Sequence, residues 1–237
     1  MMMLMHFAYD IRYIFGLDAF AFLEGTTFWV VVHPLFLVFF VGVSGICCTF
    51  SRSNFKRGIK LTVIALLETL ITAVATYYFG FDCLIIFNVL HLLALGILVY
   101  AAISFGERVF KWNPKTVNVW MAVIGLWIIV IGGDIEQYDG IIKGMWLSPL
   151  GIFGSEAVPV ADYLAIFPWL GVFLIGAIIG RVCYSDKTTL IPNTPKFVRK
   201  LMIPFEFLGK HSLIVYIVHQ PIVLGLTYLI LKIIGLV

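Results

Sequence analysis

The residues of this chain that could do chemistry are five histidines set among long apolar segments. The ordinary pKa of histidine lies close to neutral pH, so its ring can exchange protons or attack an electrophile. His219 follows Ser212 and Tyr216 at helical spacing, which places all three on one face of a helix. Because polar groups are costly in hydrocarbon, we expect this face to point into the protein and to serve a site or a pathway.

Polar residues in other segments could join that face. His91 follows Asn88 by three residues, so the two are neighbours on a helix, and His6 precedes Asp10 by four. We expect a group of these residues to converge near the outer end of one bundle: His6, His33, Asn88, His91 and Asp162. Each could instead make an interhelical hydrogen bond, and for Glu68 the structural and functional interpretations are equally open. No HxxxH or HExxH spacing is present, so we predict no metal site.

The composition indicates the setting of these residues. The chain is 62% hydrophobic and only 12% charged, with a mean hydropathy of +1.05, which is typical of an integral membrane protein. We predict an all-α polytopic membrane helix bundle with about seven spans, folded as a single domain over residues 1–237. The expected spans are the outer half of a first helix at 1–9, then 28–50, 59–79, 84–105, 117–131, 164–183 and 212–234.

The charged residues predict the topology. Most basic residues lie in three connections, around residues 52–60, 107–115 and 181–210, and the other connections are mainly acidic. By the positive-inside rule the basic connections are cytoplasmic, which puts the C-terminus outside the cell membrane. The stretch 187–210 is expected to be a basic cytoplasmic loop. The outer connection 132–163 is too apolar for a solvated loop and is expected to lie in the interface or to fold over the bundle. Nothing suggests nucleic-acid binding.

Several stretches in order resemble one known family. They are MMMLMHFAYDIRYIF, HPLFLVFFVGVSG followed by RGIKL, FNVLHLLALGIL, DYLAIFPWLGVFLIGAIIGR and LGKHSLIVYIVHQPI. Together they resemble the heparan-alpha-glucosaminide N-acetyltransferase catalytic-domain family of transmembrane acyltransferases, over nearly the whole chain. The two C-terminal stretches are the most specific.

The resemblance implies a reaction and a set of roles. An acetyl or similar acyl group would pass from cytoplasmic acetyl-CoA or another acyl-CoA to an extracytoplasmic or membrane-associated acceptor such as a sugar or glycan. His6, in the sequence HFAYD, stands where members similar to the prokaryotic branch carry a histidine. His6 or His91 would be the base or nucleophile, and Asn88 would stabilise the oxyanion. The substrate-binding candidates are Asp10, His33, Asp162 and Trp169. The donor-binding candidates are Arg181, His211, Ser212, His219 and Gln220, with the basic loop for the CoA phosphates.

Two other classes of function remain open. A transporter or channel could line its pathway with the same histidines. A haem or quinone protein could use His91 and His219. The acceptor is not identified by the sequence, and homodimer formation also stays open.

Overall fold

The membrane-spanning character of the chain is confirmed by long apolar helices. A computed structural model describes residues 2–141, 144–155, 160–188 and 195–234. Within this part of the chain all regular structure is helical, and five helical segments are long and apolar enough to cross a membrane. These segments are Phe28–Thr49, Asn54–Phe79, Val89–Val109, Pro114–Gly132 and Ser212–Ile234. The protein is therefore a multi-pass helical membrane protein.

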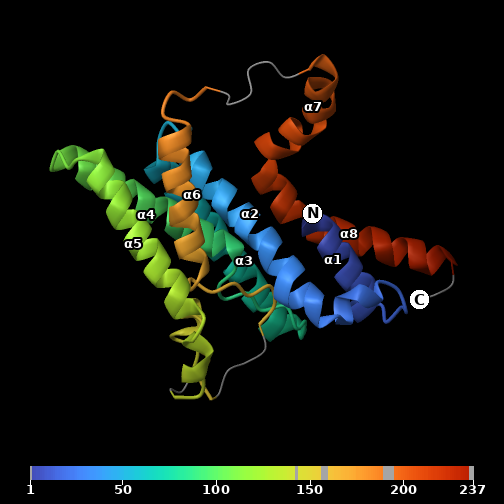
Figure 1. The fold of residues 1–237 in the computed structure, drawn as a ribbon. Coiled ribbons are helices and arrows are strands. Elements are labelled where there is room, and N and C mark those ends of the chain that lie inside the picture. The colour runs from blue at the N-terminus through green and yellow to red at the C-terminus, as the bar shows by residue number, and fades with distance from the viewer. Residues whose placement is uncertain (1, 142–143, 156–159, 189–194, 235–237) are drawn as a thin grey trace. The chain divides into compact units, whose positions relative to one another are not determined.

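The α-helices appear in Figure 1, and most match the expected spans to within a few residues. Their bounds are α1 Met2–Tyr9, α2 His33–Ile46, α3 Asn54–Phe79, α4 Val89–Val109, α5 Pro114–Gly132, α6 Trp169–Cys183, α7 Lys196–Lys210 and α8 Ser212–Ile234. The shorter α6 is equally apolar but has only 15 residues. The chain divides into two compact units, a terminal unit of Met1–Phe36 with Thr189–Val237 and a central unit of Leu37–Thr188.

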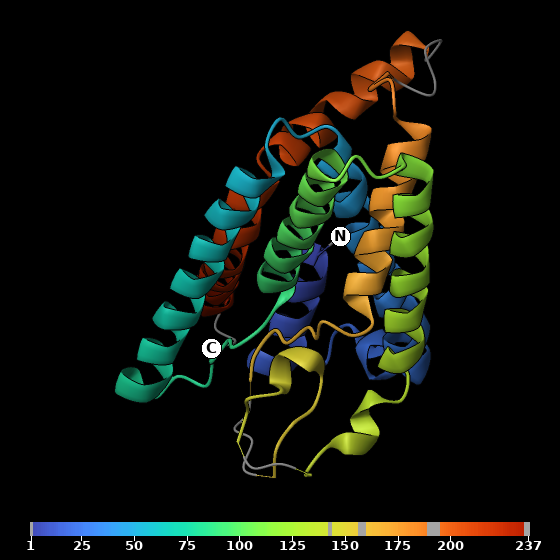
Figure 2. The same cartoon turned by 90° about the vertical axis from the view of Figure 1, so that its left-hand side faces the viewer.

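The central unit is built around α4. This helix packs against α3, α5 and α6, and Leu92 and Ile97 on it are completely buried. The pairs α3 with α4 and α5 with α6 lie side by side along their lengths (Figures 1 and 2). The side chain of Phe173 from α6 is also fully buried and lies against Gly96 of α4. These apolar contacts form the core of the central unit.

Glycines bring two helix pairs of the central unit into close contact. A Cβ at Gly176 of α6 would overlap the backbone carbonyl of Gly42 on α2, and one at Gly171 of α6 would overlap the carbonyl of Gly125 on α5. Small residues at such crossings let helix backbones approach closely, which is a common way of packing helices in membranes. The sequence of α6 therefore sets its distance to both neighbours.

The connection after α5 folds back onto the chain before α4. Ala161 donates its amide hydrogen to the carbonyl of Leu84 (2.7 Å), and Leu164 donates to Phe87 (3.1 Å). The hydroxyl of Tyr163 donates to the carbonyl of Ser148. Burial, together with nearby Asp139, raises the pKa of Tyr163 to about 12. The connection is thus held in place by hydrogen bonds, which positions Asp162 next to the first residues of α4.

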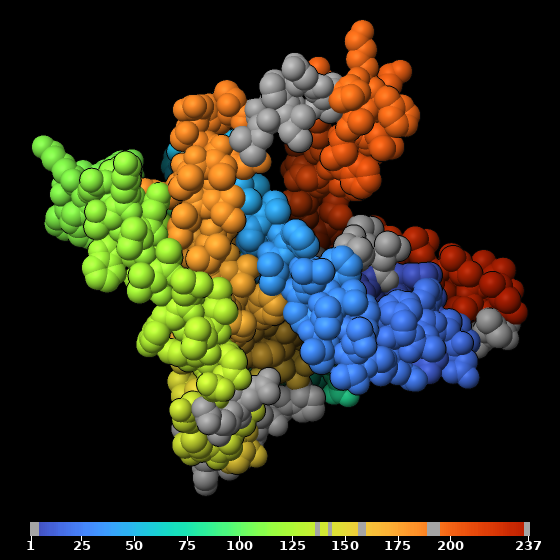
Figure 3. Space-filling view, in the orientation of Figure 1, coloured from blue at the N-terminus to red at the C-terminus, as the bar shows by residue number. Residues whose placement is uncertain are grey.

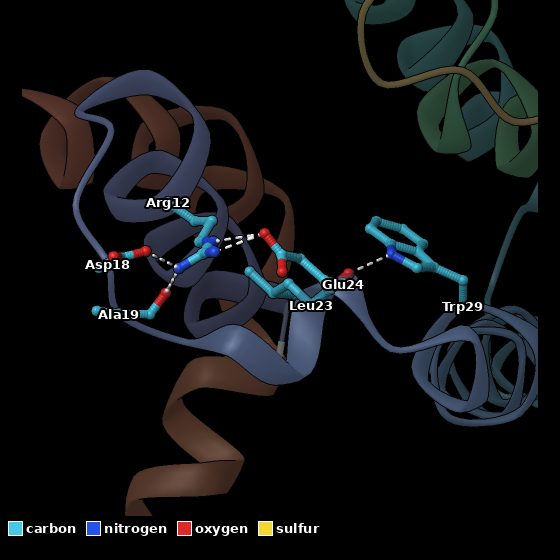
Figure 4. Close-up of polar contacts among 6 residues, drawn as sticks. All are labelled: Arg12, Asp18, Ala19, Leu23, Glu24 and Trp29. Atoms are coloured by element: carbon cyan, nitrogen blue, oxygen red, sulfur yellow. Dashed lines mark hydrogen bonds and ion pairs between the residues drawn. The ribbon is translucent and has the colours of Figure 1, made fainter.

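The terminal unit joins the two ends of the chain, because α1 packs along α8. The helix of α1 continues as a π-helical turn, Asp10–Ile14, in which Arg12 pairs with Asp18 (3.0 Å) and with Glu24 (Figure 4). Hydrogen bonding to Glu24 raises the pKa of Arg12. The indole of Trp29 donates to the carbonyl of Leu23 (2.6 Å) in the same connection. These contacts order the acidic stretch that follows α1.

The structure corrects the interpretation of residues 187–210 as a loop. From residue 196 onward this stretch forms the helix α7, and only His211 separates it from α8. Charged residues at helical spacing on an otherwise apolar stretch produce an amphipathic helix. The basic charge alone had suggested a solvated loop.

Candidate functional site

One face of α8 is polar and buried, as its sequence predicts. Tyr216 and His219 are buried within the terminal unit, whereas Ser212 and the preceding His211 are exposed. Ser212 therefore lies on the same helix face as Tyr216 and His219 but is exposed, because it is the first residue of α8. The polar face begins one turn further along the helix.

The hydrogen bonds of His219 fix the state of its ring. Its Nδ1 lies 2.6 Å from the carbonyl oxygen of Tyr216. A carbonyl can only accept, so Nδ1 must carry the hydrogen, and the neutral ring then has a lone pair on Nε2. Nε2 is buried and has no hydrogen-bond partner among the described residues. Within the terminal unit His219 is thus prepared to accept a proton.

His6 meets His219 across the contact of α1 with α8. The two ring centroids are 5.0 Å apart, and the rings are tilted by 58° to each other. His6 is half-buried. The sequence predicts a catalytic role for His6 and a donor-binding role for His219, and the fold of the terminal unit places the two side by side.

A carboxylate and an amide complete this cluster. The side chain of Gln220 donates to Oδ1 of Asp10 (3.1 Å), and Asp10 is completely buried. Oδ2 of Asp10 and Oε1 of Gln220 are buried without a partner among the described residues. Buried polar atoms are nearly always hydrogen-bonded in proteins, and π-helical turns such as the one that begins at Asp10 are frequent at functional sites. Three unsatisfied polar atoms in one cluster therefore indicate a place for a polar ligand.

We call His6, Asp10, His219 and Gln220 the terminal cluster. It is compact, since neighbouring positions on α8 bring His219 against His6 and Gln220 against Asp10. It contains a proton acceptor, a second imidazole and a carboxylate within a buried environment. These groups are sufficient for nucleophilic or general-base catalysis of acyl transfer.

A second polar cluster lies in the central unit and is centred on Asn88. The side-chain amide of Asn88 donates to Glu68 (3.0 Å) and to Asp162 (3.3 Å), and its oxygen accepts from the amide of Leu90 (3.1 Å). Asn88 is fully buried and is the N-cap residue of α4. Both amide hydrogens are used by carboxylates, so the geometry supports a role in holding α3, α4 and Asp162 together.

His91 belongs to this central cluster. Its Nδ1 lies 2.9 Å from Oδ1 of Asn88, and its Nε2 lies 3.1 Å from the hydroxyl of Thr69. The same Nδ1 also lies 3.4 Å from the backbone nitrogen of Asn88, which can only donate, so the donor and acceptor roles of the two ring nitrogens depend on the tautomer. Both nitrogens of His91 are therefore engaged by the protein, in contrast to those of His219.

The remaining candidates occupy separate places. His33 begins α2 and its ring lies against that of Trp29, with centroids 5.3 Å apart and a tilt of 54° between the rings, and Trp169 begins α6. Arg181 near the end of α6 pairs with Glu107 (2.8 Å) and donates to Asn118 (2.6 Å). No group of three or more possible metal-ligating side chains occurs among the described residues.

Described residues of the terminal unit line an apolar hollow and a basic hollow. The apolar one, of about 640 Å³, is lined mainly by residues that follow the π-helical turn Asp10–Ile14, including Phe22, Phe28 and Val32. The basic one, of about 470 Å³, lies on α7 between Lys196, Arg199 and Lys200, with Ile203 and Glu206 at its edge. The basic hollow was not foreseen as a structured surface, although the spacing of its three cations at i, i+3 and i+4 was visible in the sequence.

Comparison with protein families accounts for both the spans and the polar helices. The sequence model described as heparan-alpha-glucosaminide N-acetyltransferase, catalytic, matches residues 1–221. The chain belongs to this family. The match includes every residue of the terminal and central clusters, and the family implies a membrane-bound acetyltransferase. The heparan-alpha-glucosaminide N-acetyltransferase family generally uses acetyl-CoA as its donor. No curated protein and no solved structure matched the chain.

Proposed function

We propose that this protein transfers an acetyl or similar acyl group from cytoplasmic acyl-CoA to a sugar or glycan acceptor outside the cell or at the membrane. The observation that carries the proposal is the terminal cluster, in which buried His219, buried Asp10 and half-buried Gln220 each have an unsatisfied polar atom close to His6. Family membership makes acyl transfer the reaction to consider for such a cluster.

The groups of the terminal cluster suit a two-step transfer. In the first step a ring nitrogen of His6 attacks the acetyl carbonyl carbon, the carbon–sulfur bond breaks, and CoA leaves as its thiolate. In the second step the acceptor's amine or hydroxyl attacks the same carbon and His6 is released. Nε2 of His219 takes the proton that the acceptor loses, and this proton is finally passed to water or to the thiolate.

Asp10 and Gln220 prepare this reaction. The carboxylate of Asp10 stabilises an imidazolium ion as it forms, because opposite charges attract strongly in a buried site. Gln220 orients Asp10 through its hydrogen bond to Oδ1. The unpaired Oδ2 of Asp10 and Oε1 of Gln220 are acceptors for a hydroxyl or amine of the substrate.

The CoA phosphates need a basic site. The three cations of the basic hollow on α7 are well spaced for this, and exposed His211 and Ser212 lie between α7 and the buried part of α8. Arg181 is a further candidate, although its ion pair with Glu107 would have to open or be shared with the phosphate. We assign acyl-CoA to the cytoplasmic side, because the basic residues gather in the connections that the positive-inside rule places there.

The acceptor and the membrane topology are also assigned. His33, Asp162 and Trp169 are proposed to contact the acceptor. Asn88 and His91 remain candidates for the oxyanion and the base, but their present partners favour a structural role. In the membrane we propose seven crossings, formed by α1 as part of the first and the six longer apolar segments, within a single acyltransferase domain, with the C-terminus outside.

The reaction is tested with purified protein in proteoliposomes. Release of free CoA from acetyl-CoA is followed with a thiol reagent while the acceptor is varied among an amino sugar, its N-acetylated form and no acceptor. We expect thiol release to depend on the amino sugar and acetylated product to form in equal amount. Thiol release without any acceptor dependence, or uptake of the sugar without acetylation, would contradict the proposal, and uptake would favour a transporter.

A further inference from the structure

The helix α7 has an apolar face that no described residue of the terminal unit covers. Projected down its axis, the apolar face is centred on Leu201 and Phe205, and the charged residues occupy the other side. Phe197, Leu201 and Phe205 on this face are each more than half exposed, and α7 has no buried residue at all. In the space-filling view α7 lies apart from α1 and continues directly into α8 (Figure 3).

The connection to α8 restricts where α7 can lie. Only His211 separates the two helices, and α8 is long and apolar enough to cross the membrane. The end of α7 at Lys210 must therefore lie at a membrane surface. The helix itself cannot cross, because its 15 residues span only ~22 Å at 1.5 Å per residue and it carries five charged side chains.

The charges of α7 fit the same surface. Lys196, Arg199, Lys200 and Lys210 oppose one acid, Glu206, which gives the helix a net charge of +3. Arg199 and Lys200 lie toward the borders of the apolar face, where long side chains can reach lipid phosphates while their stems stay in contact with apolar surface. A basic helix with aromatic and aliphatic residues on one face is typical of segments that lie in the membrane interface.

We propose that α7 lies in the plane of the membrane and inserts Leu201 and Phe205 among the lipid acyl chains, with anionic phospholipid headgroups bound along its basic borders. The partner is the lipid surface itself. The polar face, with the basic hollow, then points to the aqueous phase. Arg199 and Lys200 are then shared between the lipid headgroups and the CoA phosphates. The inference itself rests on the exposure of α7 and on its connection to α8, and not on the reaction proposed above.

Two phenylalanines provide a matched test. Phe205 and Phe207 are 61% and 62% exposed, but two residues along a helix place them on nearly opposite faces. Phe205→Cys and Phe207→Cys are made in a variant without the four native cysteines and labelled with an environment-sensitive fluorophore. Each is reconstituted in nanodiscs that contain anionic phospholipid, with and without a nitroxide on the acyl chain.

We expect the label at position 205 to emit at shorter wavelength and to be quenched by nitroxide placed about 5–10 Å below the headgroups, and the label at 207 to do neither. Quenching at 205 should weaken when neutral lipid replaces the anionic lipid. If the label at 205 emits at shorter wavelength but is not quenched by the lipid nitroxide, protein covers this face. If the shorter-wavelength emission occurs only when a nanodisc holds two copies of the protein, the covering protein is a second chain. Either result, or equal quenching at both positions, would overturn the proposal.

A second measurement uses the native sequence, in case the cysteine-free variant does not fold. The protein is illuminated with a phospholipid that carries a diazirine in its acyl chain and is then digested with trypsin, which releases residues 201–210 as one peptide. We expect lipid adducts on this peptide, at Leu201 or Phe205. Adducts on α3 and α5 without any on residues 201–210 would also refute the insertion.

Discussion

Asn88 concentrates several contacts of the central unit in a single side chain. It caps α4 and donates to the carboxylates of Glu68 and Asp162, whereas Asn113 caps α5 at an exposed position. We expect Asn113→Ala to lower the free energy of unfolding by about 1 kcal/mol, as for other N-caps. We expect Asn88→Ala to lower the free energy of unfolding by a further ~1–3 kcal/mol, because the half-buried carboxylate of Glu68 loses its hydrogen-bond donor. Unfolding in mixed micelles measures both values, and equal losses would show that the carboxylates do not depend on Asn88.

Tyr163 gives the central unit a defined response to alkaline pH. Its pKa is about 12 in the folded protein and 10.0 ordinarily, so below pH 10 both folded and unfolded chains keep the proton. Between about pH 10 and 12 the unfolded chain ionises first, and the stability contributed by this residue is lost. We expect the melting temperature of the wild type to fall more over this range than that of Tyr163→Phe. Parallel curves would contradict the buried hydroxyl.

At the residue scale the sequence indicated candidate residues better than it indicated their partners. His219 stands out through its helical phase in an apolar segment, and His6 and Asp10 through their spacing and the resemblance of the sequence HFAYD to the family. The bond from Gln220 to Asp10 joins the two ends of the chain and follows no local spacing, so it could not be foreseen. The hydrogen bonds of the histidine rings could not be foreseen either. Both ring nitrogens of His91 have hydrogen-bond partners, whereas Nε2 of His219 has none among the described residues.

At the scale of elements, helix contacts in the central unit depend on particular glycines. A methyl group at Gly176 would meet the backbone of α2, whereas one at Gly225 in α8 would meet nothing within 4 Å. We expect Gly176→Ala to destabilise the protein by forcing α2 and α6 apart. Gly225→Ala should be neutral or stabilising by up to about 1 kcal/mol, because alanine favours the helix. Thermal unfolding in detergent compares the two variants, and equal effects would contradict the close crossing of α2 and α6.

Helix boundaries were predictable only where apolar residues marked them. The span at 212–234 was predicted to the residue, whereas α3 begins five residues earlier than expected because Ser53 caps it and the charged residues that follow still form helix. Helix α7 was missed, although its alternation of basic and apolar residues at helical spacing carried the signal. In membrane proteins, charge marks the end of the hydrocarbon region, which is not always the end of the helix.

At the scale of the whole molecule, composition was enough to predict a multi-pass helical membrane protein. Hydropathy predicts the membrane spans, because an apolar segment in lipid must pair its own backbone N–H and C=O groups and therefore forms a helix. Hydropathy does not predict which helices pack against one another. In the central unit these contacts follow from the glycines of α6 and from the packing around Phe173. The family match agrees with the ordered motifs, since both extend over nearly the whole chain.

The central claim is that the terminal cluster carries out acetyl transfer, and the initial rate of transfer from labelled acetyl-CoA to an amino sugar tests it most directly. In proteoliposomes with equal amounts of folded protein, we expect His219→Ala to lower this rate by about 10²–10⁴-fold, the usual contribution of a general base. Val218→Ala, at the exposed neighbouring position on α8, should retain the wild-type rate. A His219→Ala variant that is folded and as fast as the wild type would contradict the account.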